Sequence, residues 1–159
     1  MILLALDTSV ASTGFAIFNE KQEIITYGNI PTEKKDFETE DLRLNYIGNV
    51  IDELIRTYNV TDIIEEDQFT SINSKTILLL RKLVGVISRI AYKYEINISY
   101  VYPSQWRAKL GIKGKDKKLA AFNYLKDNNI IDLGELKTSG KKKNDDITDA
   151  LCIGLSYFK

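Results

Sequence analysis

The sequence contains no histidine and a single cysteine, and both shortages limit the chemistry open to the chain. Histidine is the commonest general base and transition-metal ligand, and structural zinc sites are built from cysteine and histidine. A zinc site is therefore not expected. Any bound metal should be a hard ion held by oxygen, which favours Mg²⁺ with Mn²⁺ as a substitute. The lone Cys152 cannot form an internal disulfide and indicates a reducing, cytoplasmic compartment.

A long hydrophobic run is also missing. The apolar start, Met1–Leu6, ends at Asp7 and is too short for a signal peptide or a membrane span. The 159 residues suffice for one domain with a sizeable core, and neither an internal repeat nor a linker divides them. We therefore expect one domain over residues 1–159 that has no contact with a membrane.

The net charge is zero, but the two signs are unevenly distributed along the chain. Residues 1–70 carry 14 of the 22 acidic side chains and 5 of the 22 basic ones, so the remainder is basic. An asymmetry of this kind indicates an anionic partner for the basic half. The alternative is that the halves interleave in space and their fields cancel, and charge alone does not decide between the two.

Hydrophobic periodicity predicts the element order β-β-β-α-β-α-β-α-α. Strands are expected at 2–7, 15–19, 24–28, 61–67 and 96–102, and helices at 39–58, 75–94, 119–125 and 145–155, with a short helix opened by Pro103 and running through Trp106. The second and third strands are close enough in sequence to form a hairpin. The expected fold class is α/β, with a mixed five-stranded sheet of three antiparallel strands and then two parallel ones, and helices on both faces.

Three groups of carboxylates stand where this fold would bring them together. Asp7 ends the first strand, and Glu65 and Glu66 end the fourth, which should lie beside it. Asp146 and Asp149 are three residues apart and share one face of the last helix. Such a cluster would repel itself unless cations bridge it, and two Mg²⁺ ions in a shared site can clamp the oxygens of phosphoryl transfer. The alternatives are a solvated strand end and, for the helix pair, complementarity to the helix dipole.

The motifs around these carboxylates resemble those of the RuvC family of Holliday junction resolvases, especially its short bacteriophage members. The resemblance is carried in the family's order by Leu6-Asp7-Thr8-Ser9 with Ser12-Thr13-Gly14-Phe15, by Ile64-Glu65-Glu66-Asp67-Gln68-Phe69, and by Asp146-Ile147-Thr148-Asp149-Ala150-Leu151. It implies an RNase H-like fold, a homodimer, and Mg²⁺-dependent cleavage of four-way and other branched DNA junctions. Thr8 and Ser9 depart from the Pro-Gly turn that is usual in the family.

The resemblance also implies which residues would bind the metal, with two ions per site. The implied catalytic and metal-binding set is Asp7, Glu66, Asp146 and Asp149. Because side chains alternate faces along a strand, only one of Glu65 and Glu66 can point into the site. The spacing to Phe69 favours Glu66.

Basic residues in the second half of the chain are candidates for contacts with DNA phosphates. Arg107 and Lys117 loosely match basic positions that contact DNA in the family. Together with the lysine run before the last helix, the candidates are Arg107, Lys113, Lys117, Lys118, Lys141, Lys142 and Lys143. Phe69 is expected to stack on bases opened at the junction, the alternative being that it packs into its own core.

The helix at 75–94 is apolar on more than one face, which indicates deep burial or contact with a partner chain. Gly85 in its middle would cost helix stability unless it allows close packing. We therefore expect the homodimer to form through this helix.

Three other functions fit parts of the sequence. Another RNase H-like nuclease, acting on RNA–DNA hybrids or flaps, would use the same carboxylates. The segment around Asp7 and Thr13-Gly14 resembles the first phosphate loop of sugar kinases and actin-like ATPases, but those proteins need a second, similar domain for which this chain is too short. A junction-binding module without activity is the third, and the intact acids at every motif position argue against it.

Overall fold

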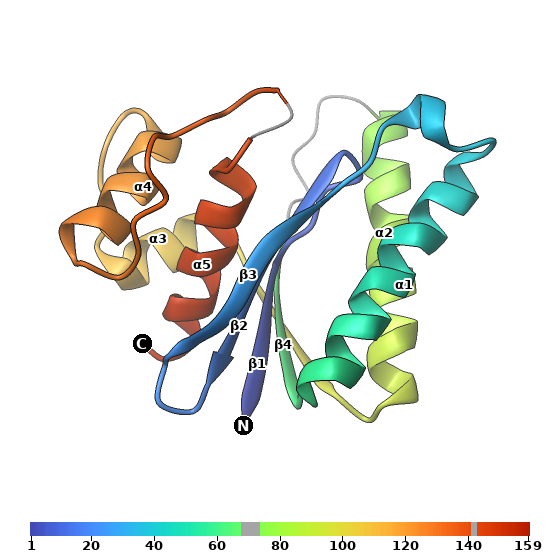
Figure 1. Ribbon diagram of the computed structural model, residues 1–159, viewed down its shortest axis with the longest axis horizontal. Helices are drawn as coiled ribbons and strands as arrows, with labels where there is room; N and C mark the ends of the chain where they lie inside the picture. Colours follow the sequence, from blue (N-terminus) through green and yellow to red (C-terminus); the bar gives the residue numbers. More distant parts are fainter. Residues whose placement is uncertain (68–73, 141–142) are drawn as a thin grey trace.

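The computed structural model describes residues 1–67, 74–140 and 143–159. At its centre is a five-stranded sheet in the order β3-β2-β1-β4-β5 (Figure 1). The strands are β1 (Ile2–Asp7), β2 (Ser12–Asn19), β3 (Ile24–Pro31), β4 (Asp62–Glu66) and β5 (Asn97–Val101). β1 pairs antiparallel with β2 and parallel with β4, and β5 is parallel to β4. The predicted mixed sheet is confirmed.

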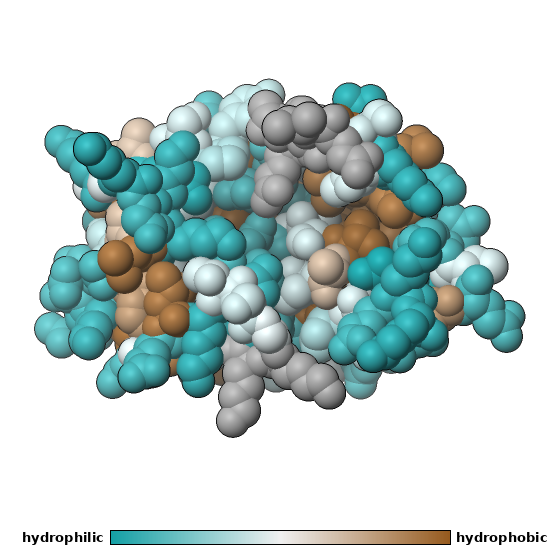
Figure 2. Space-filling model, turned by 90° about the horizontal axis from the view of Figure 1, so that it is seen from above, coloured by the Kyte–Doolittle hydropathy of each residue, from teal (hydrophilic) through white to brown (hydrophobic). Residues whose placement is uncertain are grey.

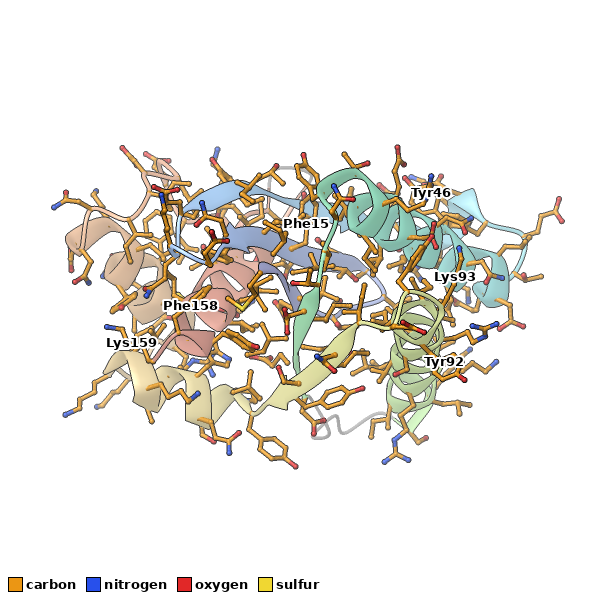
Figure 3. All side chains as sticks on the ribbon, turned by 90° about the horizontal axis from the view of Figure 1, so that it is seen from below. Phe15, Tyr46, Tyr92, Lys93, Phe158 and Lys159 are labelled. Atoms are coloured by element: carbon orange, nitrogen blue, oxygen red, sulfur yellow. The ribbon has the colours of Figure 1, made fainter. Side chains whose placement is uncertain are left out.

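Helices cover both faces of this sheet, as predicted (Figure 1). One layer consists of α1 (Glu40–Tyr58) and α2 (Ser74–Lys93). The other consists of α3 (Pro103–Leu110), α4 (Lys117–Asp127) and α5 (Asp145–Tyr157). A short 3₁₀ turn at Lys34–Asp36 precedes α1. Figure 3 shows the separation of the layers, with Tyr92 and Lys93 of α2 on one side and Phe158 and Lys159 on the other.

Alternation along the central strand β1 assigns each side chain to one of two cores. Leu3 and Ala5 belong to the core shared with α3, α4 and α5. Leu4 and Leu6 belong to the core shared with α1 and α2. Because side chains on a strand repeat every two residues, Asp7 points to the same face as Leu3 and Ala5, the face covered by α5.

Two glycines let α5 lie directly against β2. A Cβ atom placed at Gly14 would fall 2.1 Å from the carbonyl oxygen of Asp146, the second residue of α5. A Cβ atom at Gly154 would fall 2.1 Å from the ring of Phe18. Gly14 is also the cross-strand partner of Asp7. The Thr-Gly step of the first motif therefore brings the start of α5 close to the end of β1.

Close packing between α1 and α2 depends on Gly48. A Cβ atom at Gly48 of α1 would lie 2.6 Å from Val86 Cγ1 of α2, whereas no described atom lies within 4 Å of a Cβ atom at Gly85. Gly85 therefore does not mark close packing inside the described chain, and its place in a contact between two copies stays a prediction. Gly85 is exposed, and periodicity could not show which face of α2 meets α1.

Several boundaries differ from the predicted ones. β2 begins at Ser12 because Thr13 and Gly14 already pair with β3, so the turn after Asp7 shrinks to four residues. α3 continues to Leu110, whose side chain is buried, and ends at Gly111 in the left-handed region. α4 starts at Lys117 because the Asp116 carboxylate caps it by accepting from Leu119 N. Over the described residues, none of the helices has both the length and the apolar character needed to cross a membrane.

Candidate active site

The candidate site lies at the edge of the sheet where the parallel strands β1 and β4 both end. Asp7 is the last residue of β1 and Glu66 the last residue of β4. Ile64 packs in the core beneath α5, and Glu66 follows it by two residues, so Glu66 faces α5 as Asp7 does. The two carboxylates therefore share one face although 58 residues separate them in sequence.

Helix α5 adds Asp146 and Asp149 to this face. All four carboxylates are close enough to interact electrostatically. Burial, followed by the charges of Glu66, Asp149 and Asp146, holds the pKa of Asp7 well above its usual range. Burial, with the charge of Glu66 next in importance, raises the pKa of Asp149 to about 7. Groups that resist ionisation in this way favour a bound cation, which would stabilise their charged forms.

The adjacent glutamates have different environments. Glu65 is fully buried and points to the opposite face of the sheet, where it accepts a hydrogen bond of 2.6 Å from Thr8 Oγ1. Burial raises the pKa of Glu65 to about 7. Glu66 Oε2 instead accepts from Trp106 Nε1 at 2.5 Å. Of the two, only Glu66 interacts with Asp7 and Asp149.

The donor set suits a hard divalent ion. Asp146 Oδ2 and Asp149 Oδ1 are buried and have no hydrogen-bond partner among the described residues, so both are available as ligands. Carboxylate oxygens of this kind are the ligands that Mg²⁺ and Mn²⁺ prefer. Among the described residues, no three Asp, Glu or Cys side chains lie close enough together to bind one metal ion at the same time. The four carboxylates would therefore have to move closer to one another to bind an ion.

A cavity of about 940 Å³ opens beside Glu66. Glu66 lines it on the sheet side, the turn 8–11 on a second side, and Leu79 and Leu80 of α2 on a third. Arg107 and Lys117 contribute positive charge to its wall. Figure 2 looks down on this end of the molecule, which is hollowed between the two helix layers. A cavity with carboxylates at one wall and cations at another fits a phosphate-containing chain.

Comparison with known proteins gives the family. The family model described as "Crossover junction endodeoxyribonuclease RuvC" matches residues 3–157. The chain belongs to the RuvC family. Among curated relatives, the crossover junction endodeoxyribonuclease RuvC of Dictyoglomus thermophilum is 27% identical over 99% of this chain and 96% of its own. The RuvC of Prochlorococcus marinus is 31% identical over 98% of this chain and 95% of its own.

Solved structures agree on the fold. Thermus thermophilus RuvC in complex with a Holliday junction substrate superposes with a TM-score of 0.75 at 16% identity, covering 99% of this chain and 92% of that one. The α/β fold is therefore that of RuvC, an RNase H-like fold, as predicted. The RuvC family is typically metal-dependent, in agreement with the oxygen-rich donor set.

The basic residues predicted to bind DNA lie in different places in this RuvC-family chain. Arg107 and Lys117 line the cavity, and the Arg107 guanidinium stacks 4.1 Å from the Trp106 ring. Lys118 and Lys143 are both paired with acidic residues of α5. Lys113 is exposed in the loop between α3 and α4. Three further candidates lie outside the described residues, namely Phe69, Lys141 and Lys142.

Trp106 was not recognised in the sequence as part of the site. It is fully buried at the start of α3, and its indole N–H holds one carboxylate oxygen of Glu66. The signal was available, because Trp106 follows Pro103 just after β5, the strand expected beside β4. A buried indole N–H needs an acceptor, and Glu66 at the end of the neighbouring strand is within its reach.

Arg43 was also missed, and it supports the turn that follows Asp7. The guanidinium donates from Nε to Thr32 Oγ1 at 2.7 Å and from Nη2 to the Thr32 carbonyl oxygen at 3.0 Å. Thr32 in turn donates its hydroxyl to the Val10 carbonyl and its N–H to the Ala11 carbonyl. Arg43 also lines the cavity. A lone arginine in an acidic half of the sequence carries no signal of this role.

Asp145 is the first residue of α5, a position where an acidic side chain complements the helix dipole. Its side chain is only 3% exposed and forms ion pairs with Lys118 of α4 and with Lys143. The ion pair of Asp145 with Lys118 therefore connects the first turn of α5 with the first turn of α4, beside the carboxylate site. Spacing along the chain does not indicate these ion pairs, because the contact with Lys118 depends on how α4 packs against α5.

Proposed function

We propose that this RuvC-family crossover junction endodeoxyribonuclease uses Asp7, Glu66, Asp146 and Asp149 as its metal-binding and catalytic set. The observation that supports the proposal is the convergence of four interacting carboxylates, from two strand ends and one helix face, beside a cavity that Glu66 lines. Burial and mutual repulsion of these groups favour cations between them. We also propose that residues 1–159 form one nuclease domain, since helices from both halves of the chain cover a single sheet.

In phosphodiester hydrolysis, some residues of the chain would bind the metal ions and others would orient these ligands. Two Mg²⁺ ions, replaceable by Mn²⁺, supply when bound the Lewis acidity that the reaction needs. Asp7 and Glu66 would hold them from the sheet, and Asp146 and Asp149 from α5. The indole N–H of Trp106 fixes the orientation of the Glu66 carboxylate, a second layer of support that metal sites commonly need.

We propose four-way and other branched DNA junctions as the substrate. The Thermus thermophilus relative was solved with a Holliday junction, and the family model carries the crossover-junction name over nearly this whole chain. Arg107 and Lys117, which line the cavity, would contact phosphates, and Lys113, Lys118 and Lys143 lie on neighbouring segments. Stacking of Phe69 on an opened base and phosphate contacts of Lys141 and Lys142 belong to the same proposal.

We further propose a homodimer that forms through α2. Within the described chain, only Leu83, Ile87 and Ala91 of this helix are fully buried, while Leu78 is 57% exposed. A groove of about 550 Å³ beside Gly85 separates the exposed faces of α1 and α2. Two symmetric nicks in a four-way junction need two active sites related by a two-fold axis, which a dimer supplies.

The proposal includes the cellular compartment in which the protein acts and its origin. Cys152 is a buried thiol, and the chain has no cysteine with which it could pair, which suits the reducing cytoplasm of a bacterial host. The short phage-type members of the family, which the three motifs resemble, are the proposed origin.

A cleavage assay on a synthetic four-way junction tests the proposal. The wild-type protein should make paired nicks with Mg²⁺ or Mn²⁺ and none with EDTA, and Asp146→Asn should still fold and bind the junction without cutting it. Matched RNA–DNA hybrid and flap substrates of equal length are the comparison. Faster cleavage of the hybrid or the flap than of the junction would favour a different RNase H-like nuclease.

A further inference from the structure

The strongest unexplained feature beside the site is the side chain of Lys143. Its ammonium nitrogen lies 2.8 Å from Asp146 Oδ1 and 3.5 Å from Asp145 Oδ1. Lys143 is partly buried, with 28% of its side chain exposed. Burial by itself would lower the pKa of Lys143, but contacts with Asp146 and then Asp145 raise it, so the side chain stays charged. The charge of Lys143 also acts on Asp7, whose pKa it lowers. One ammonium group therefore neutralises part of the carboxylate cluster.

The chain holds this lysine in place from two sides. Asp145, whose side chain is 3% exposed, contacts Lys118 through Oδ2 and Lys143 through Oδ1. Lys143 immediately precedes Asn144, which is itself fixed by hydrogen bonds to the carbonyl oxygens of Leu133 and Glu135. The position of the ammonium group thus follows from contacts with several segments, which distinguishes it from a flexible surface lysine.

We propose that Lys143 is a built-in counter-cation of the carboxylate site, which competes with a divalent metal ion for Asp146 and withdraws when the ion binds. The inference rests on the proposed metal-binding role of Asp146. An ammonium group on Asp146 Oδ1 would repel a metal ion on the unpartnered Oδ2 of the same carboxylate, so binding of the ion disfavours the lysine contact. Lys143 would then serve as a positioning residue that holds Asp146 and Asp145 in place before metal and DNA arrive.

Competition has a thermodynamic consequence that does not involve cleavage. If Lys143 stabilises the metal-free site, its contact with Asp146 must be broken before the ion binds, and the metal affinity is reduced accordingly. Removing the ammonium group should therefore tighten metal binding by about fivefold, the lower part of the usual range for coupling between two binding events. The metal-free protein should become less stable in the same variant, because the carboxylates lose their internal cation.

The experiment is a Mn²⁺ titration of the DNA-free protein, followed by the electron paramagnetic resonance signal of free Mn²⁺ at low salt. Lys143→Gln removes the charge and keeps much of the side-chain length. Lys126→Gln is the matched control, since it makes the same change at an exposed position in the last turn of α4. We expect tighter Mn²⁺ binding for Lys143→Gln and wild-type affinity for Lys126→Gln. The melting temperature in EDTA should fall only for Lys143→Gln, and its increase on adding Mn²⁺ should be larger than in the wild type.

A second variant, Asp146→Asn, distinguishes a failure of the proposed competition by Lys143 from a failure of the proposed metal-binding set. If Asp146→Asn weakens Mn²⁺ binding but Lys143→Gln leaves it unchanged or weakens it, the competition is wrong and the proposed metal set stands. If Asp146→Asn has no effect on Mn²⁺ binding, the metal set itself fails and the role of Lys143 falls with it. Circular dichroism of each variant shows whether a change in affinity reflects the site or a loss of folded protein.

Discussion

At the scale of single residues, Glu65 and Glu66 show how a shift of one position along a strand changes a side chain's role. Both are acidic, buried and at the end of β4. Alternation turns Glu66 toward Asp7 and α5, and turns Glu65 toward Thr8 on the other face. The two glutamates therefore form a matched pair for mutation.

Glu66→Gln should abolish junction cleavage, while Glu65→Gln should retain most of it. Loss of a carboxylate that holds a metal ion should reduce the cleavage rate by about 100-fold or more, as removal of one electrostatic stabiliser commonly does. Glu65→Gln keeps a group that accepts from Thr8 and leaves the metal-facing carboxylates in place. Single-turnover cleavage of a four-way junction measures both. The reverse pattern would mean that Glu65 is the ligand.

Gly14→Ala should damage both the fold and the site. The added methyl group would lie 2.1 Å from the Asp146 carbonyl oxygen, so the first turn of α5 must move away from β2. Overpacking of this kind costs about 1–3 kcal/mol of unfolding free energy, and the displacement should also slow cleavage. Gly85→Ala is the control, because no described atom lies within 4 Å of its new methyl group. Urea denaturation at one protein concentration should show a loss for Gly14→Ala and no loss for Gly85→Ala.

At the scale of elements, the start of α4 connects a helix cap to two of the lysines proposed to contact DNA. Asp116 caps this helix, and the next two residues are Lys117 and Lys118. Lys117 lines the cavity, and Lys118 pairs with Asp145 of α5. The geometry of the cap therefore decides where two positive charges lie.

Asp116→Ala should lower the unfolding free energy by about 1 kcal/mol, the usual cost of removing a helix cap. Asp116→Asn makes the same change in charge but keeps a capping oxygen, so its stability should stay near that of the wild type. Thermal denaturation compares the three proteins. Equal destabilisation by Ala and Asn would show that the charge of Asp116 matters and the cap does not.

Lys117→Ala should weaken binding to junction and to linear duplex DNA alike. Loss of one phosphate contact should reduce the slope of log affinity against log salt by about 1. Lys126→Ala, at the far end of the same helix, is the control and should leave the slope unchanged. Fluorescence anisotropy at several salt concentrations gives the slopes. A slope in Lys117→Ala identical to that of the wild type would rule out a phosphate contact at this position.

At the scale of the whole molecule, the open face of α2 is the surface on which the proposed dimer depends. Tyr92 is 80% exposed and Leu78 is 57% exposed on this helix, and Gly85 has open space above it. Gly48 and Val86 account for the close approach between α1 and α2 inside the chain. The exposed side of α2 is thus free to meet a second copy.

Gly85→Glu should convert a dimer into a monomer without unfolding it. The new side chain has room in the isolated chain but would place a charge within the proposed contact. Sedimentation velocity at micromolar concentration should give a dimer for the wild type and a monomer for the variant, with paired nicking reduced to independent single nicks. Lys126→Glu, on the opposite helix layer, should remain dimeric. A monomeric wild type that makes no paired nicks would argue against the dimer.

Much of the fold follows from local patterns in the sequence. Period-two and period-3.6 hydrophobic runs located the strands and helices, because a strand or a helix must bury one face or stripe. Chain order and right-handed crossovers then placed β4 beside β1, so the proximity of Asp7 and Glu66 could be foreseen. Boundaries such as the extra turn of α3 depended on burial of Leu110, which no local pattern shows.

The sequence by itself thus determined the element order and the positions of the carboxylates, because each depends on residue type and local spacing. Only the tertiary structure decided which side chains support them. The Trp106 hydrogen bond to Glu66 and the Lys143 contact with Asp146 depend on distances of a few ångströms between side chains. Gly48 lies at the contact between α1 and α2 because packing in three dimensions sets the rotation of each helix, and the hydrophobic period of the sequence does not specify that rotation.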